Sequence, residues 1–162
     1  MRGADVGHWL RFHSLPDSKR HAVTQDERRI VLGRANTIAC TALGEGAPCW
    51  LIQAGEAALG WPADAERPRI TFGLQHVNDY EFDETRWPTY AVLTTFRPGA
   101  FDALIVDIAE DRAFRTLWMS PVNGRVFAPY EGGIDLFLES ASLVDELKAA
   151  HKQWLSPRED GL

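Results

Sequence analysis

Residues 89–119, TYAVLTTFRPGAFDALIVDIAEDRAFRTLWM, contain three apolar stretches separated by two short polar linkers. Stretches rich in β-branched and aromatic residues favour β-strands, so we predict strands over 89–97, 101–109 and 114–119. The linkers RPGA and EDRA have the length of hairpin turns, which indicates that consecutive strands run antiparallel. This stretch therefore predicts a fold built on an antiparallel sheet.

Further strands are predicted on both sides of this stretch. Near the N-terminus a strand over 8–15 would direct Leu10 and Phe12 inward. The remaining apolar runs predict strands over 49–54, 69–74, 125–128 and 134–138, the last two joined by the turn PYEGG. The expected sheet has five to seven strands and is mostly a meander.

Two helices are predicted. Thr24 and Glu27 have the spacing of a capping box, and a stripe of apolar residues follows them, which predicts a helix over 25–43. A second helix is expected to begin at Ser142 and to end before Pro157. With both helices packed on one face of the sheet, the fold class is α+β.

Size and composition indicate a single globular domain over residues 1–162, with frayed ends at 1–7 and 156–162. Hydrophobic residues make up 45% of the chain and charged residues 25%, which is typical of globular proteins. The sequence has no apolar run of the length of a signal peptide or a membrane span, so we expect a cytoplasmic protein with no membrane partner.

The net charge of −6 makes a nucleic acid an improbable partner, because an acidic protein repels phosphate backbones. It favours a basic protein instead. The two cysteines, Cys40 and Cys49, form no CxxC pair and have no histidine at the spacing of metal ligands, so neither a metal nor another cofactor is expected.

The most acidic stretch is QHVNDYEFDETRW at 75–87, which has the composition of a loop. Its candidate binding residues are Asp79, Tyr80, Glu81, Phe82, Asp83, Glu84 and Trp87. The carboxylates could attract a basic protein and the aromatic rings could anchor it. A hard cation is a further alternative, although the spacing is not that of an EF-hand, and a solvated loop remains open.

A second polar loop, at 13–21, follows the first predicted strand. Its candidate residues for a small ligand or for hydrolase chemistry are His13, Ser14, Asp17, Ser18, Lys19, Arg20 and His21. Lys19 and Arg20 could hold an anionic group while a histidine acts as a base. This hypothesis requires the loop to fold against the PYEGG turn, and a solvated loop is again the alternative.

Both ends of the chain resemble a family of small uncharacterised bacterial proteins. The resemblance rests on FHSLPDSKR at 12–20, on Arg34-Ala35-Asn36-Thr37, and on APYEGGIDLFL at 128–138 followed by a helix that ends in QWLS. The family begins with a similar HSLP-SKR motif and ends with PYDGG-D. No chemistry is assigned to it, so the resemblance implies no role for any residue.

The first functional hypothesis is a small acidic binding protein that occludes a basic partner, in the manner of an immunity protein. This analogy is one of size and charge rather than of motif. The alternatives are an enzyme or ligand binder that uses the 13–21 loop, and a structural homodimer joined through an exposed edge strand. The oligomeric state stays open between monomer and homodimer.

Overall fold

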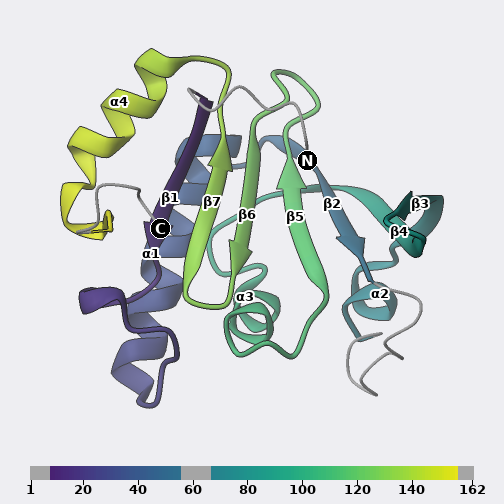
Figure 1. Cartoon of the computed structure of the whole chain (residues 1–162), viewed down its shortest axis with the longest axis horizontal. Coiled ribbons are helices and arrows are strands. Elements are labelled where there is room, and N and C mark those ends of the chain that lie inside the picture. Colours follow the sequence, from purple (N-terminus) through teal and green to yellow (C-terminus); the bar gives the residue numbers. More distant parts are fainter. Residues whose placement is uncertain (1–7, 56–66, 157–162) are drawn as a thin grey trace.

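The computed structural model describes residues 8–55 and 67–156, which form one seven-stranded sheet with four α-helices (Figure 1). The strands are β1 Trp9–His13, β2 Pro48–Ala54, β3 Gln75–Phe82, β4 Thr85–Thr95, β5 Arg115–Met119, β6 Val126–Tyr130 and β7 Gly133–Phe137. The helices are α1 Gln25–Leu43, α2 Arg67–Phe72, α3 Asp102–Ala109 and α4 Ala141–Ala150. The strand order is β1-β7-β6-β5-β2-β4-β3, every pair is antiparallel, and the sheet is open. The α+β fold class is confirmed.

The hydrophobic core lies on one side of the sheet, between the strands and the helices. Leu10 and Phe12 of β1 point into it, as predicted. Helix α1 contributes Ala35, Ile38 and Ala39, and α3 contributes Leu104 and Ile105. Figure 1 shows α1 and α3 behind the sheet, and the core also includes Val144 and Leu147 of α4.

The long helix forms where its capping box predicts. The backbone N–H of Glu27 donates to the Thr24 hydroxyl, and the Glu27 carboxylate accepts from the Thr24 N–H, so two free amides of the first turn are satisfied. The final helix starts one residue before the predicted position, because Ser140 serves as its N-cap and accepts from the Leu143 N–H.

The strand predicted over 101–109 is wrong, because these residues form α3. Phe101, Leu104, Ile105 and Ile108 are buried and follow the spacing i, i+3, i+4, i+7 of one helix face. The run of β-branched residues obscured that period. It follows that RPGA and EDRA are not hairpin turns: β4 and β5 are not neighbours, and β2 lies between them.

The strand predicted over 69–74 is also wrong, since α2 ends at Phe72 and Leu74 is a buried connection to β3. Pro68 stands in the first turn of this helix, where its missing N–H costs no hydrogen bond. The Phe72 ring packs 5.2 Å from the ring of Phe101 and joins α2 to the core.

In the part of the chain that the structure describes, no helix combines the length and the apolar character needed to cross a bilayer. The expected fraying of 1–7 and 156–162 falls outside the described residues except for Ser156, and residues 56–66 lie outside them as well.

Candidate functional site

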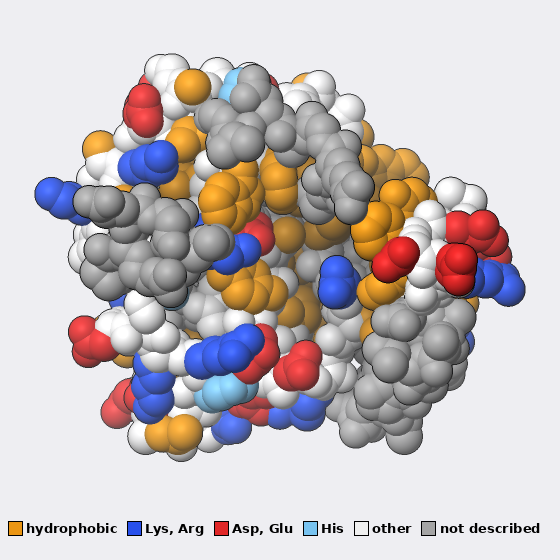
Figure 2. Space-filling model, in the orientation of Figure 1, with side chains coloured by type: hydrophobic (Ala, Val, Ile, Leu, Met, Phe, Trp, Pro, Cys, Tyr) orange, Lys and Arg blue, Asp and Glu red, His pale blue; other side chains and the backbone are white. Residues whose placement is uncertain are grey.

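The side of the sheet that faces away from the core, here called the open face, carries a continuous apolar row. Within the described ranges α1 and α3 cover the other side, where Val144 and Leu147 of α4 and Phe72 of α2 also join the core. The row crosses six strands through the paired residues Trp9, Phe137, Val126, Met119, Trp50 and Leu93. At a strand spacing of about 4.8 Å it extends for about 24 Å. Figure 2 shows this side of the molecule, with hydrophobic side chains across its middle and beside the β3–β4 hairpin.

The open face was missed from the sequence, although its signal is present there. An antiparallel sheet with one covered face shows apolar and polar residues in alternation. In β2 and β5, by contrast, Trp50-Leu51-Ile52 and Leu117-Trp118-Met119 are apolar at every position. Leu51 and Trp118 are fully buried in the core, so their neighbours along the chain point to the open face. Strands of this kind give the sheet an apolar surface on both of its faces.

The acidic stretch at 75–87 was predicted as a loop, and this is wrong. Its residues form β3, a two-residue turn at Asp83-Glu84 and the start of β4, a unit here called the acidic hairpin. Asp79-Tyr80-Glu81-Phe82 does alternate acidic and aromatic residues, but the first half of the strand is polar apart from Val77, and seven of its eight residues are exposed. The turn also lacks glycine, although Asp83 and Glu84 have φ of 50° and 62°.

The acidic hairpin exposes both aromatic rings and carboxylates. Tyr80 is 56% exposed and Phe82 is 46% exposed. In the ladder they stand opposite Trp87 and Thr85, on the same side of the sheet as Leu93, so the hairpin continues the open face. Trp87 is partly buried, and the guanidinium of Arg115 lies 5.0 Å from its ring centre.

The four hairpin carboxylates differ in their partners. Asp79 accepts from His76 at 2.8 Å and also from Arg86, and these two hydrogen bonds hold the pKa of the Asp79 carboxyl below its usual value. Glu81, Asp83 and Glu84 form no ion pair with any other described residue. Within the described residues these three carboxylates are therefore not neutralised by an ion pair.

The 13–21 loop folds against the turn between β6 and β7, as the ligand hypothesis requires. The Ser14 N–H donates to the carbonyl of Gly132 at 3.0 Å. Glu131 binds two residues of the loop, with Arg20 Nε at 3.1 Å and His21 Nε2 at 2.8 Å. The structure thus brings together residues that lie more than a hundred positions apart in the sequence.

The cations of this loop already have acidic partners. Lys19 pairs with Glu27 at the start of α1, and the Glu27 carboxylate also accepts from the backbone of Val23, so these contacts lower the pKa of Glu27 to about 2. Arg20 pairs with Glu131. An anionic ligand would therefore have to displace the carboxylates of Glu27 and Glu131 from these two cations. Asp17, the acidic residue of the loop, is exposed and has a backbone φ of 55°, in the left-handed region.

His13 and Ser18 form a hydrogen bond across the loop, with His13 Nε2 and Ser18 Oγ 3.2 Å apart. Partial burial, together with the charges of Arg11 and Arg34, lowers the pKa of the His13 imidazole. Its ring is therefore neutral at physiological pH and can accept a proton.

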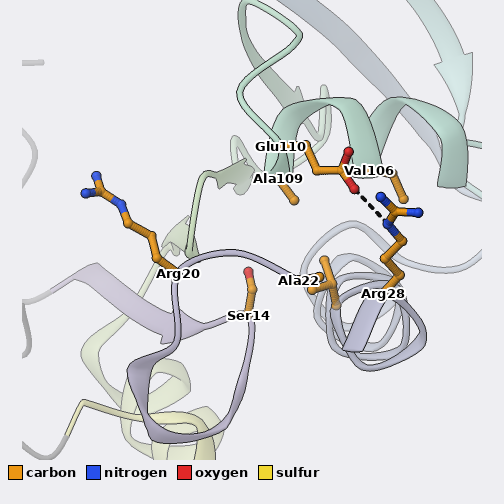
Figure 3. A pocket seen from close by; sticks show the side chains of 8 residues that line it. Ser14, Arg20, Ala22, Arg28, Val106, Ala109 and Glu110 are labelled. Atoms are coloured by element: carbon orange, nitrogen blue, oxygen red, sulfur yellow. Dashed lines mark hydrogen bonds and ion pairs between the residues drawn. The ribbon is translucent and has the colours of Figure 1, made fainter. Parts of the chain in front are cut away.

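Beside the loop lies a small cavity with a volume of about 10 Å³ (Figure 3). Ser14 points into it, Arg20 extends away, and an ion pair between Arg28 and Glu110 at 2.7 Å closes one side. A space of this size accommodates about one water molecule and no larger ligand.

The two candidate sites lie at opposite ends of the sheet. The 13–21 loop follows β1 and the acidic hairpin contains β3, and these are the two terminal strands (Figure 1). Across the described residues no group of three or more histidine, cysteine or acidic side chains could hold a metal ion. A small-molecule ligand could therefore not contact both sites.

The chain belongs to the family of the domain of unknown function DUF3885, which matches residues 1–159. This confirms the resemblance to a family without assigned chemistry. No curated protein and no solved structure matches the chain.

Proposed function

We propose that the protein is a binding module that holds a basic protein partner against the acidic hairpin and the adjoining part of the open face. The observation that carries this proposal is the position of Tyr80 and Phe82, two exposed aromatic side chains beside three carboxylates that form no ion pair with any other described residue. Aromatic side chains are enriched in protein interfaces, and tyrosine is common among the few residues that contribute most of the binding energy. The carboxylates select a partner of opposite charge.

The two kinds of side chain would act at different stages of binding. The hairpin carboxylates attract a basic surface over a distance and raise the association rate, an effect that salt screens over about 10 Å. The aromatic rings and Leu93, which is 54% exposed, then lose their water on contact and slow dissociation. Charge and apolar contact can thus be separated in a kinetic experiment.

The finer proposal is that this module acts in the cytoplasm and occludes the basic surface of a toxin domain, as an immunity protein does. Its support is the small size of the chain, its net charge of −6 and the concentration of carboxylates on one hairpin. Covering a basic active surface requires a matching acidic one, and the hairpin provides it.

The test begins by capturing partners from a lysate of the native host and identifying a stoichiometric one. Its binding kinetics are then measured at several salt concentrations. The variant Asp79→Asn, Glu81→Gln, Asp83→Asn, Glu84→Gln should slow association by about tenfold and flatten the salt dependence. The control variant Asp26→Asn, Asp111→Asn, Asp145→Asn, Glu146→Gln changes the net charge equally at exposed sites outside the hairpin.

The control variant should retain a steep salt dependence, because the charges near the contact are intact. Equal slowing in both variants would show that only net charge matters. A partner that is acidic, or one that binds the hairpin variant as fast as the wild type, would contradict the proposed function.

A second candidate function, acyl transfer at the 13–21 loop, rests on the hydrogen bond between Ser18 and His13. The neutral His13 ring could take the Ser18 proton as the hydroxyl oxygen attacks an ester carbonyl, and could return that proton to the alcohol that leaves when the ester C–O bond breaks, so that the acyl group is transferred to Ser18. A fluorophosphonate probe should then label the wild type and neither Ser18→Ala nor His13→Asn. Ser14→Ala serves as the control, and equal labelling of all four proteins would exclude this chemistry.

A further inference from the structure

The outer edge of β3 is where the sheet ends. Among the described residues β3 pairs only with β4, and its side chains are exposed along almost the whole strand. A terminal strand carries backbone N–H and C=O groups that can pair with another extended chain. The question is which groups of β3 face outward and which side chains accompany them.

The position of Pro88 in β4 shows which backbone groups of β3 face outward. This proline stands opposite Asp79 in the ladder and has no N–H, so these two residues cannot exchange a pair of hydrogen bonds. Bonded and non-bonded pairs alternate along an antiparallel ladder, so Glu81 and Arg86 form a non-bonded pair as well. The backbone N–H and C=O groups of Asp79 and Glu81 therefore point away from β4, toward the free edge.

The side chains of β3 have different characters on its two sides. Asp79 and Glu81 are acidic and lie on the side of the helices, where Asp79 contacts His76 and the His76 ring packs 5.4 Å from that of Tyr90. Tyr80 and Phe82 are aromatic and lie on the open face. An adjacent strand would meet carboxylates on one side and aromatic rings on the other.

We propose that β3 binds an extended segment of the basic partner as an eighth strand, and that this segment alternates basic and apolar residues. Its basic side chains would lie beside Asp79 and Glu81, and its apolar side chains beside Tyr80 and Phe82. The proposal rests on the proposed function and adds the binding mode and the sequence pattern of the partner.

The first test uses a fluorescent synthetic peptide that alternates lysine and valine, with its binding to the whole chain measured by anisotropy. A peptide of equal composition with the lysines and valines in separate blocks should bind at least about tenfold more weakly, because only the alternating peptide matches both sides of β3. Two N-methylated peptides, each blocked at one alternate set of amides, should differ: one set faces β3 and the other does not.

The second test changes the edge itself. Glu81→Pro removes an N–H that points outward and leaves the β3–β4 ladder intact, since proline is tolerated on that side of an edge strand. Glu81→Gln removes the same charge and keeps the N–H. Glu81→Pro should therefore bind the alternating peptide about tenfold more weakly than Glu81→Gln, with an unchanged circular dichroism spectrum and thermal midpoint.

The outcomes separate this inference from the proposed function. Equal binding of the alternating and block peptides, or of the two Glu81 variants, would overturn strand addition even if the native partner still depends on the hairpin carboxylates. A dimer in light scattering that Glu81→Pro dissociates would assign the edge to a second copy of this chain and would also overturn it. A captured partner that ignores the carboxylates would instead contradict the proposed function.

Discussion

Arg11 and Asp135 form a two-pronged ion pair between the first and the last strand of the chain. Arg11 Nε lies 2.7 Å from Asp135 Oδ1, and Arg11 Nη2 lies 2.9 Å from Asp135 Oδ2. The guanidinium also lies 5.0 Å from the ring centre of Trp9 and 4.9 Å from that of Tyr130. Arg11 directly precedes the stretch 12–20 and Asp135 lies within 128–138, two of the three stretches on which the family resemblance rests.

This ion pair should contribute measurably to stability, because its geometry is bidentate and both side chains are partly buried. Arg11→Lys retains the charge and loses the planar fork, and Asp135→Asn retains the shape and loses the charge. Each should lower the free energy of unfolding in urea by about 1 kcal/mol. Arg29→Lys, which alters an exposed pair with Asp26, is the control and should change it by less than about 0.5 kcal/mol. An equal loss of unfolding free energy at the Arg11–Asp135 and Arg29–Asp26 pairs would contradict the prediction that the bidentate pair contributes more.

Gly133 should not tolerate a side chain. A Cβ there would lie 2.8 Å from the carbonyl oxygen of Phe12 in the backbone of β1 and would also overlap the Tyr130 hydroxyl. Gly133→Ala should therefore lower the free energy of unfolding by about 2 kcal/mol. Gly33→Ala is the matched control, because its Cβ would meet nothing within 4 Å in the middle of α1. That change should stabilise the protein by about 0.5–1 kcal/mol.

Stability should fall as the pH drops below neutral, because two partly buried histidines resist protonation. Burial lowers the pKa of His151, which stacks 4.2 Å from Trp154, and burial also lowers the pKa of His13. Below the unfolded pKa of about 6.5 the unfolded chain therefore binds more protons than the folded one. The stabilisation is complete above that pH and is lost as the pH falls toward the lowered folded values.

Thermal unfolding at pH ~7.5 and ~5.5 measures this effect while carboxylates remain ionised. His151→Gln and His13→Asn should each reduce the difference between the two thermal midpoints. His8→Gln leaves His13 and His151 in place, so this control variant should keep the difference between the two thermal midpoints. A wild type that is equally stable at both pH values would contradict the prediction.

Substitutions in the turn of the acidic hairpin should stabilise the protein. Asp83 and Glu84 both have positive φ, a conformation that asparagine and glycine adopt at lower cost. Asp83→Asn with Glu84→Gly should raise the free energy of unfolding by about 1 kcal/mol, and it should slow association with a basic partner because two carboxylates are lost. Asp83→Glu with Glu84→Asp retains both charges and should bind as the wild type does. A double variant with no gain in stability would contradict the assigned turn.

Local sequence signals account for the elements that depend on neighbouring residues. The capping box at Thr24 and Glu27 and the apolar stripe after it predicted α1 correctly, because an N-cap and a helix face are set within a few turns of chain. The hairpin of β6 and β7 was also predicted, since Gly132, with φ 89°, permits the tight turn between two apolar strands. The α+β class followed from the sum of such signals.

The remaining elements, and the strand order, depend on contacts between residues that are distant in the sequence. Residues 101–109 have enough β-branched side chains for a strand, and they form α3 because Leu104, Ile105 and Ile108 fill the core beside α1. The strand β3 buries almost none of its side chains, so the acidic and aromatic alternation at 79–82 had no core face to support it, and the strand forms through its ladder with β4. The meeting of Arg20 with Glu131 and the apolar row from Trp9 to Leu93 depend on strand order. Strand order is a balance of many long-range packing and pairing energies, so no local window of the sequence contains it.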